Sequence, residues 1–168
     1  KIYQIKSEQV NGKHFEYAQR APGTRTILDN GKEILLTKEF RREQNTYDYR
    51  IPGGKVFDTL EELNNFTGDM LEKAKEGAIR EVKEETGILI NSIKLLKVSK
   101  CGATVMWDLY YFVSTDFEIT KESQKEEDED ISEGWYSYSE VIEMCKKGLV
   151  NEDRTLGILL QYLIKLTS

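Results

Sequence analysis

The stretch Met70–Ile88, which reads MLEKAKEGAIREVKEETGI, decides how this sequence folds. It is bounded by residues that are typical of helix ends. Asp69 precedes it as an N-cap residue, and Gly87 is a typical C-terminal stop. The stretch therefore predicts a helix over Met70–Thr86.

Acidic residues on the apolar face of this helix are its unusual feature. On a helical wheel with about 100° per residue, the apolar stripe consists of Leu71, Ala74, Ala78 and Val82. Glu81 and Glu85 fall within this stripe, one turn apart, and Glu84 lies beside them. Buried carboxylates need a compensating cation. Arg80 is one neighbour, but three oxygen ligands in one turn suit Mg²⁺ or Mn²⁺ better. The alternative is a charged helix with ordinary i,i+4 ion pairs.

Length and composition narrow the class of protein. The chain has 168 residues, of which 39% are hydrophobic, and a formal net charge of −6. We expect a single domain over 1–168 with its own core. The negative charge argues against nucleic acid or an anionic membrane as a partner. Apolar runs are too short to cross a bilayer, and the first residues lack a signal-peptide pattern, so we expect a cytoplasmic protein.

The scarcity of cysteine and histidine argues against two common kinds of site. The chain has two cysteines, Cys101 and Cys145, without paired-ligand spacing, and one histidine, His14. A Cys/His zinc site cannot be assembled from this set. Serine–histidine–aspartate catalysis would depend on His14 alone.

The rest of the chain predicts strands interleaved with helices. Strands are predicted at Ile2–Ile5, Phe15–Gln19, Thr24–Leu28, Glu33–Phe40, Tyr47–Ile51, Ile93–Ser99, Val105–Thr115 and Trp135–Ser137. Asn11-Gly12, Pro22-Gly23 and Asn30-Gly31 suggest hairpins between the first of them. Further helices are predicted after the capping residues Thr59 and Ser137, and from about Asp153 to Leu166. This order predicts an α/β domain with a mixed sheet.

The acidic helix resembles the Nudix box. Glu72, seven further residues and then REVKEETGI (80–88) match every fixed position of that pattern from its first glutamate onward. The resemblance implies the Nudix α/β/α sandwich and extends over the chain, with 1–22 as a small N-terminal antiparallel β subdomain. The glycine that opens the pattern is replaced by Phe66; Gly54 resembles its counterpart, and Gly68 is the alternative. Residues 55–67 therefore resemble an insertion, either a flap near the site or a neutral surface elaboration.

The resemblance also implies roles for residues of the box. Glu81, Glu84 and Glu85 would be metal ligands, for Mg²⁺ or alternatively Mn²⁺. The backbone carbonyl of Gly53 would be a further ligand. Glu72 and Arg80 would form an ion pair that holds the geometry of the catalytic loop and helix. Both are expected catalytic-site residues for that reason.

Several segments resemble the Nudix branch that hydrolyses ADP-ribose and nucleoside-diphosphate sugars. They are Leu35–Arg41, Tyr49–Gly54 and the acidic run Glu126–Ile131. In that branch an acidic loop supplies the general base, which makes Glu127 the first candidate and Glu129 the second; a solvated charge run is the alternative. The N-terminal strands resemble a dimerisation subdomain, so a homodimer is expected.

Substrate-binding residues are expected at the same turn and on neighbouring strands. Arg41, Arg42 or Arg50 would hold phosphate groups, and Gly54 would lie beside them. Trp107 would stack on a base, although an aromatic residue on a strand is more often part of the core. No proline follows the box, which weakens the match to ADP-ribose enzymes in particular.

The resemblance therefore predicts an enzyme that hydrolyses the pyrophosphate bond in a nucleoside diphosphate linked to another moiety, either ADP-ribose or a nucleotide sugar. Its partner would be a small nucleotide. One alternative is hydrolysis of nucleoside triphosphates, including deoxynucleotides, or of dinucleoside polyphosphates. Another is a Nudix-like module that binds its ligand without catalysis.

The charge of the chain is unevenly distributed. Residues Glu118–Glu133 contain eight acids and two bases, which leaves 22 acids and 22 bases elsewhere. The whole excess of negative charge therefore lies in the candidate base loop, and bound metal ions would explain how an anionic substrate approaches it.

Overall fold

The computed structural model describes residues 3–42, 44–120 and 131–167 of the chain. Its nine strands in this part of the chain are β1 Tyr3–Val10, β2 Lys13–Arg20, β3 Gly23–Leu28, β4 Glu33–Arg41, β5 Thr46–Arg50, β6 Ile88–Ser99, β7 Val105–Met106, β8 Leu109–Ile119 and β9 Ile131–Ser137. The helices are α1 Leu60–Asn65, α2 Met70–Thr86, α3 Tyr138–Lys146 and α4 Asp153–Thr167. Among the helices of the described part, none is long and apolar enough to span a membrane.

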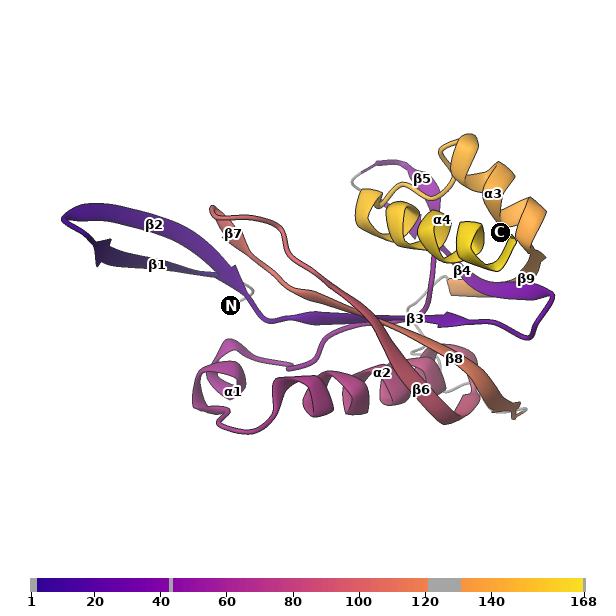
Figure 1. Ribbon diagram of the computed structural model, residues 1–168, viewed down its shortest axis with the longest axis horizontal. Helices are drawn as coiled ribbons and strands as arrows, with labels where there is room; N and C mark the ends of the chain where they lie inside the picture. Colours follow the sequence, from indigo (N-terminus) through magenta and orange to yellow (C-terminus); the bar gives the residue numbers. More distant parts are fainter. Residues whose placement is uncertain (1–2, 43, 121–130, 168) are drawn as a thin grey trace.

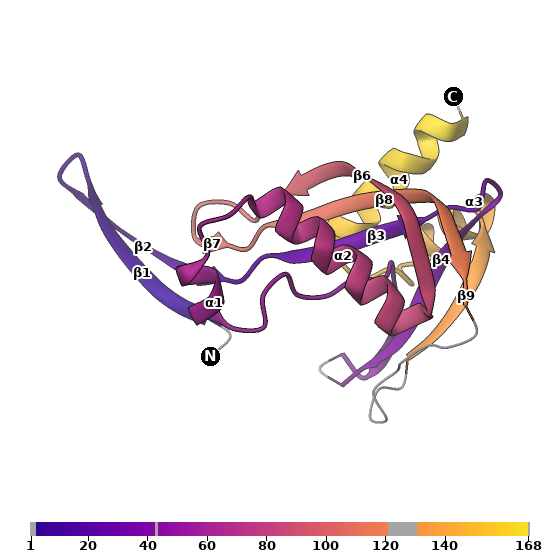
Figure 2. The same ribbon diagram turned by 90° about the horizontal axis from the view of Figure 1, so that it is seen from below.

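The strands form three small sheets that helices cover from two sides. Their orders are β3-β8-β6, β5-β4-β9 and β1-β2-β7, and β3 runs parallel to β8 while β6 is antiparallel to it. In Figure 1, α2 lies on one side of the strands and α3 and α4 lie on the other. This is the predicted α/β/α arrangement with mixed strand directions. The β1–β2 hairpin projects away from this body (Figures 1 and 2).

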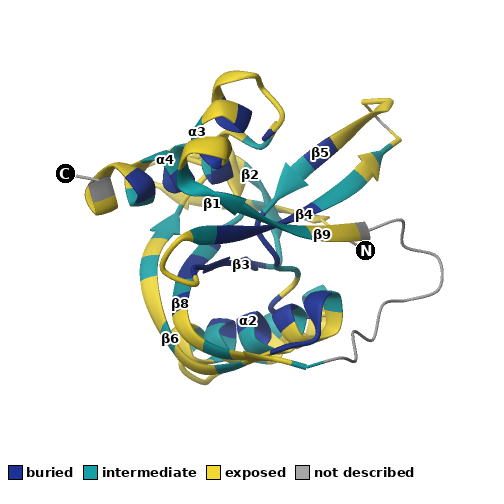
Figure 3. Cartoon of the chain, turned by 90° about the vertical axis from the view of Figure 1, so that its right-hand side faces the viewer, coloured by how far each residue is buried: buried dark blue, intermediate teal, exposed yellow. Residues whose placement is uncertain are grey.

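The core consists of apolar clusters on both faces of the β3-β8-β6 sheet. On one face, Val82 of α2 packs with Leu28 and Ile88. On the other face, Leu159 and Leu163 of α4 pack with Tyr111 of β8. Figure 3 marks buried residues in dark blue on α2, α4, β3 and β8. The sheet is therefore covered on both faces, and its strands are held in place where the site forms.

Three hairpins were predicted, and the structure contains one of them as expected. Asn11 and Gly12 join β1 to β2 with φ angles of 51° and 75°, the two positive values that a type I′ turn needs. Pro22-Gly23 does not form a hairpin, because the chain there passes from β2 into a different sheet. Asn30-Gly31 makes a turn, but β3 and β4 share only the Asp29–Ile34 bridge before they diverge into separate sheets.

The predicted helix over Met70–Thr86 is confirmed together with both of its ends. Asp69 accepts the N–H of Leu71 at 2.7 Å, and Gly87 adopts a left-handed φ of 67°. Ala74, Ala78 and Val82 are buried as predicted, whereas Leu71 is 37% exposed and does not belong to the core. Leu71 lies in the first turn, where the preceding segment packs against Met70 and Ala74 instead.

Residues 55–67 pack beside α2. Val56 and Phe57 are buried against Ala74 and Ala78, and the Phe57 and Phe66 rings meet edge to face at 5.2 Å. The predicted cap holds the short helix α1, since Thr59 accepts the N–H of Glu62 at 3.1 Å. In Figure 2, α1 lies beside the first turn of α2, whereas the box residues Glu81, Glu84 and Glu85 belong to its last turns.

Several predicted strand boundaries were wrong: β1 extends to Val10 rather than Ile5, β9 begins at Ile131 rather than Trp135, and two further differences lie around β7 and β6. The strand expected at Val105–Thr115 is divided into β7 and β8 by Trp107 and Asp108, which lie between two sheets. β6 begins at Ile88, directly after the Gly87 cap, rather than at Ile93. These errors arise because pairing partners, and not local propensity, decide where a strand starts and stops.

Candidate active site

Gly53 and Gly54 follow β5 and a bend at Pro52, and this glycine turn lies in space between β3 and α2. The N–H of Thr24 donates to the Gly54 carbonyl at 2.9 Å, and the N–H of Thr26 donates to the Pro52 carbonyl at 2.8 Å. Gly53 has a φ of 152°, and a Cβ there would lie 2.1 Å from the Thr24 carbonyl oxygen. No other residue fits at position 53, so the turn is fixed against β3.

The same turn receives two carboxylates of α2. The N–H of Gly53 donates to Oε2 of Glu85 at 3.0 Å. The Glu81 carboxylate lies directly over Gly54, where an added Cβ would stand 2.0 Å from its Oε2. Glu81 is only 17% exposed, so the acids predicted on the buried face do lie on it. Two side chains that are one helical turn apart thus contact two adjacent glycines.

Arg80 balances part of this negative charge. Its Nη2 donates to Oε1 of Glu81 at 2.7 Å and to the Lys55 carbonyl at 3.0 Å, and its Nε lies 3.8 Å from Oε2 of Glu84. The hydrogen bond with Glu81 is the main cause that raises the pKa of Arg80. Arg80 therefore holds two of the three box carboxylates and joins them to residue 55.

The ion pair that the resemblance implied between Arg80 and Glu72 is not formed. Glu72 is exposed, and its Oε2 lies 3.9 Å from Nζ of Lys75. The reason is geometric: the two residues are eight positions apart, which is about 12 Å along a helix axis. Arg80 pairs instead with acids of its own and the next turn.

The donor chemistry of the box fits a divalent ion. Glu81, Glu84 and Glu85 offer the carboxylate oxygens that Mg²⁺ and Mn²⁺ prefer, and Glu84 keeps a half-exposed side chain. Within the part of the chain that the structure describes, no three His, Cys, Asp or Glu residues are grouped closely enough to hold one ion. For all three carboxylates to share one ion, their oxygens would have to lie closer together than they do beside Arg80 and the Gly53 N–H.

Two of the three candidate phosphate-binding arginines, Arg41 and Arg50, lie on neighbouring strands. Arg50 ends β5, just before the glycine turn, and pairs with the fully buried Asp48. Arg41 ends β4 at the other end of the same strand pair, and its Nη2 lies 2.6 Å from Oε2 of Glu39. Arg50 directly precedes the glycine turn in the sequence. Arg41 lies farther from the turn, because it pairs with Thr46 at the opposite end of β5 from Arg50.

Trp107 lies in the short break between β7 and β8. The guanidinium carbons of Arg20 and Arg154 are 4.4 Å and 4.3 Å from its ring centroid. Arg154 also donates to the Trp107 carbonyl at 3.0 Å. The ring therefore connects the end of β2 to the start of α4 through two cation–π contacts.

Two charged residues of this region were missed by the reading of the sequence. Arg25 lies in the middle of β3, between the buried residues Thr24 and Thr26. Glu152 accepts hydrogen bonds from the Tyr111 hydroxyl at 3.2 Å and the Thr155 N–H at 3.0 Å. Burial opposes ionisation of Glu152, but the Thr155 hydrogen bond and Arg154 keep its pKa below the usual value. The available signal was a lone arginine inside a buried strand.

The two candidate general bases belong to the acidic run after β8. Glu127 and Glu129, the candidate bases, lie in 121–130, outside the described residues.

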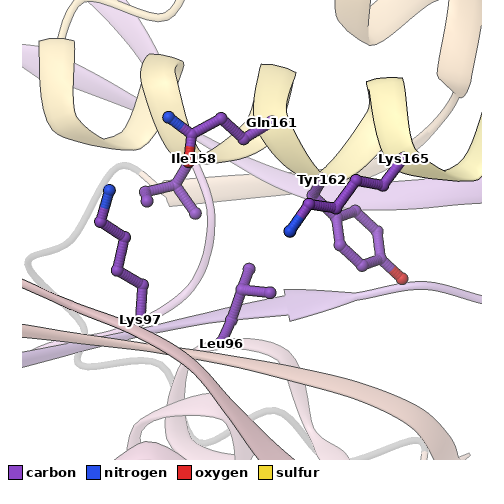
Figure 4. Close-up of a pocket in the computed structure, with 6 residues that line it drawn as sticks. All are labelled: Leu96, Lys97, Ile158, Gln161, Tyr162 and Lys165. Carbon is purple, nitrogen blue, oxygen red and sulfur yellow. The ribbon is translucent and has the colours of Figure 1, made fainter.

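A separate hollow lies between β6 and α4, away from the box. Figure 4 shows its lining residues: Leu96, Lys97, Ile158, Gln161, Tyr162 and Lys165. It has two lysines and no carboxylate, so it offers none of the ligands that a divalent metal prefers.

Comparison with known proteins identifies the class. Residues 19–156 match the NUDIX domain, so the chain belongs to the NUDIX family. It is a Nudix hydrolase, with the box residues described above at its candidate active site.

One curated relative is similar over most of its length. The chain is 30% identical over 156 residues to a GDP-mannose pyrophosphatase of Enterobacter sp. (strain 638), which covers 88% of this chain and 76% of the relative.

Solved structures confirm the fold. An ADP compounds hydrolase superposes with a TM-score of 0.68 at 18% identity, covering 98% of this chain and 93% of the other. A MutT NUDIX hydrolase from Burkholderia pseudomallei reaches a TM-score of 0.51 at 24% identity, covering 71% and 84%. At these identities the similarity establishes the Nudix fold and no more.

Proposed function

We propose that this protein uses a divalent metal ion to hydrolyse the pyrophosphate bond of a nucleoside diphosphate linked to another moiety, either ADP-ribose or a nucleotide sugar. The observation that carries the proposal is the contact of Glu81 and Glu85 with Gly54 and Gly53. The similarity to a GDP-mannose pyrophosphatase over most of the chain supports this substrate class.

The metal would be Mg²⁺, with Mn²⁺ as the alternative, held by Glu81, Glu84, Glu85 and the Gly53 carbonyl. When bound, a divalent ion neutralises phosphate charge and lowers the pKa of a coordinated water. The contacts of Arg80 keep Glu81 and Glu84 on the same side of the helix.

Substrate contacts are proposed on the strands around the turn. Arg41 and Arg50 would bind phosphate oxygens, since a guanidinium offers two parallel donors. Gly54 would allow the substrate to approach the backbone closely. Trp107 would stack on a base only after one of the arginines on its ring moves aside.

Glu127 is proposed as the base that accepts the proton of the attacking water, with Glu129 as the alternative. The test compares Glu127→Gln and Glu129→Gln, each at saturating substrate and Mg²⁺. We expect one of them to reduce kcat by at least about 100-fold. Full activity in both would show that the acidic run is only solvated charge.

A substrate panel tests the function. ADP-ribose, GDP-mannose, UDP-glucose, diadenosine polyphosphates and deoxynucleoside triphosphates are incubated with the protein in Mg²⁺ and in EDTA. We expect turnover of a nucleotide sugar or ADP-ribose that EDTA abolishes. Turnover of the triphosphates or dinucleoside polyphosphates alone would favour the other Nudix activities, and no turnover at all would favour a binding module.

The metal ligands are tested with a matched pair of variants on the same helix. Glu85→Gln should reduce kcat by about 100-fold or more, because a neutral amide replaces a charged ligand. Glu76→Gln is the control, since Glu76 is 69% exposed and pairs with Lys73 on the outer face of α2. Equal activity of Glu85→Gln and wild type would contradict the metal assignment.

The larger organisation is part of the same proposal. We propose one domain over 1–168 that forms a homodimer through residues 1–22 and acts on small nucleotides rather than nucleic acids. A cytoplasmic location is proposed because both cysteines, Cys101 and Cys145, are free thiols, which a reducing compartment maintains.

A further inference from the structure

Arg25 lies directly behind the turn that contacts the box carboxylates. It is in register with Tyr111 of the adjacent parallel strand. A Cβ on Gly53 would stand 2.8 Å from the Arg25 Cα, so the two backbones are in contact. The N–H of the same Gly53 donates to Glu85. Arg25 therefore contacts Gly53, which itself contacts the proposed metal ligand Glu85, and it approaches the proposed metal site from β3.

The guanidinium of Arg25 has few hydrogen-bond acceptors for a charged group that is largely buried. One Nη donates to the neighbouring Thr24 carbonyl at 3.0 Å. Its Nε is buried and has no hydrogen-bond partner among the described residues. Burial, and then the charge of Arg50, lower the pKa of Arg25. A cation held beside another cation with an unused donor is costly unless an anion completes the site.

The acids around Arg25 are already engaged. Glu152 accepts from Tyr111 and Thr155 and pairs with Arg154 at 3.1 Å. Glu85 accepts from Gly53. Arg50, the neighbouring cation, is held by the buried Asp48. These contacts leave the Nε of Arg25 without a protein acceptor, although two carboxylates contribute to its electrostatic surroundings.

We propose that Arg25, together with Arg50, binds the diphosphate group of the substrate on the strand side of the metal site. This inference rests on the proposed function and assigns a residue that lies outside the box. It also gives an anionic substrate two guanidinium groups to pair with in a protein whose net charge is −6. Arg25 would contact phosphate oxygens through the donors that the protein leaves free.

The test measures binding separately from turnover. The affinity of α,β-methylene-ADP, whose bridge cannot be hydrolysed, is measured by calorimetry in Mg²⁺, and KM and kcat are measured on the best substrate of the panel. We expect Arg25→Met to weaken binding and to raise KM by about 10-fold or more, since a charged hydrogen-bonding group is lost. Arg25→Lys should lie between Arg25→Met and wild type, because lysine keeps the charge but loses the fork.

Lys97→Met is the matched control, since it removes one positive charge at the hollow between β6 and α4. It should bind the probe as wild type does. Thermal melting establishes that each variant is folded; if Arg25→Met does not fold, Arg25→Lys must still show weaker binding.

Two outcomes separate this inference from the proposed function. If the wild type hydrolyses a nucleotide sugar but both Arg25 variants keep wild-type affinity and KM, the inference is overturned and the function stands. If the wild type hydrolyses nothing but binds the probe through Arg25, the proposed function fails and the inference stands. A wild type that does not bind the probe overturns the inference.

Discussion

At the scale of single residues, Gly53 and Gly54 exclude side chains for different reasons. A Cβ on Gly53 would meet backbone atoms of Thr24 and Arg25, which cannot move without breaking β3. The atoms nearest to a Cβ on Gly54 belong to the end of the Glu81 side chain, which can rotate. The first glycine is therefore required by the fold and the second by the position of a carboxylate.

This difference predicts the behaviour of Gly54→Ala. The variant should fold, because the nearest obstacle is the movable Glu81 carboxylate, but its activity should fall by about 10-fold or more as a proposed metal ligand is displaced. Its melting temperature and its kcat in Mg²⁺ are measured together. Gly157→Ala is the control: a Cβ there meets nothing within 4 Å, and alanine is the better helix residue. Full activity of Gly54→Ala would contradict the role given to Glu81.

At the scale of elements, one buried acid ties two helices to the sheets. Asp29, at the turn between β3 and β4, accepts the Tyr138 and Tyr162 hydroxyls, each at 2.7 Å, and the N–H of Gly31 at 2.7 Å. Tyr138 begins α3 and Tyr162 lies in α4. The turn where the two sheets diverge is thereby joined to both helices on that side of the molecule.

These tyrosines predict how stability depends on pH. Burial, the hydrogen bond to Asp29 and the charge of Asp29 raise the pKa of Tyr138 to about 12, and the same causes raise that of Tyr162. The pKa of tyrosine in an unfolded chain is about 10. The protonated folded form is thus fully favoured below the unfolded pKa, and its contribution is lost as pH rises through the folded pKa.

We therefore expect the melting temperature of the wild type to decline from about pH 10 upward. A Tyr138→Phe, Tyr162→Phe variant should be less stable at neutral pH, with a shallower decline. Tyr47→Phe is the control, since Tyr47 is 43% exposed and lies outside this cluster. Parallel melting curves for all three proteins between pH 8 and 11 would contradict the assignment.

At the scale of the whole molecule, the β1–β2 hairpin stands apart from the body (Figure 1). It carries exposed apolar side chains, among them Ile5 at 70% and Phe15 at 47% exposure. Its anchors include the hydrogen bond of Gln4 to Asn64 and the contact of Arg20 with Trp107. A projecting strand pair with exposed apolar residues is a surface on which a second copy of the chain can pack.

The proposed dimer predicts the effect of charges on this hairpin. Ile5→Glu combined with Phe15→Glu should convert the dimer to a monomer, measured by light scattering after gel filtration. Ile119→Glu is the control, because Ile119 is 68% exposed but lies at the end of β8. A wild type that is monomeric at micromolar concentration, or a dimer that survives both charges, would contradict the proposal.

Much of the fold was predictable because its signals are local. The helix over Met70–Thr86 and its caps Asp69 and Gly87 were correct to the residue, since capping depends on adjacent backbone groups. The Pro22-Gly23 hairpin was wrong because a turn sequence does not say which sheet receives the next strand. Arg25 was missed because an arginine in a strand becomes informative only when its neighbours are known.

Spacing along one helix is a property of the chain, so the Nudix family, the acidic helix and the position of its carboxylates on a mostly buried face were predictable before folding was known. Only the tertiary structure placed Gly53 against Glu85, Gly54 over Glu81, and Arg25 behind the same turn. These contacts join residues that are distant in the chain, so they depend on how β3, the turn and α2 pack together. The pairing of Arg80 with Glu81 rather than Glu72 is local by contrast, because it follows from the distance along one helix.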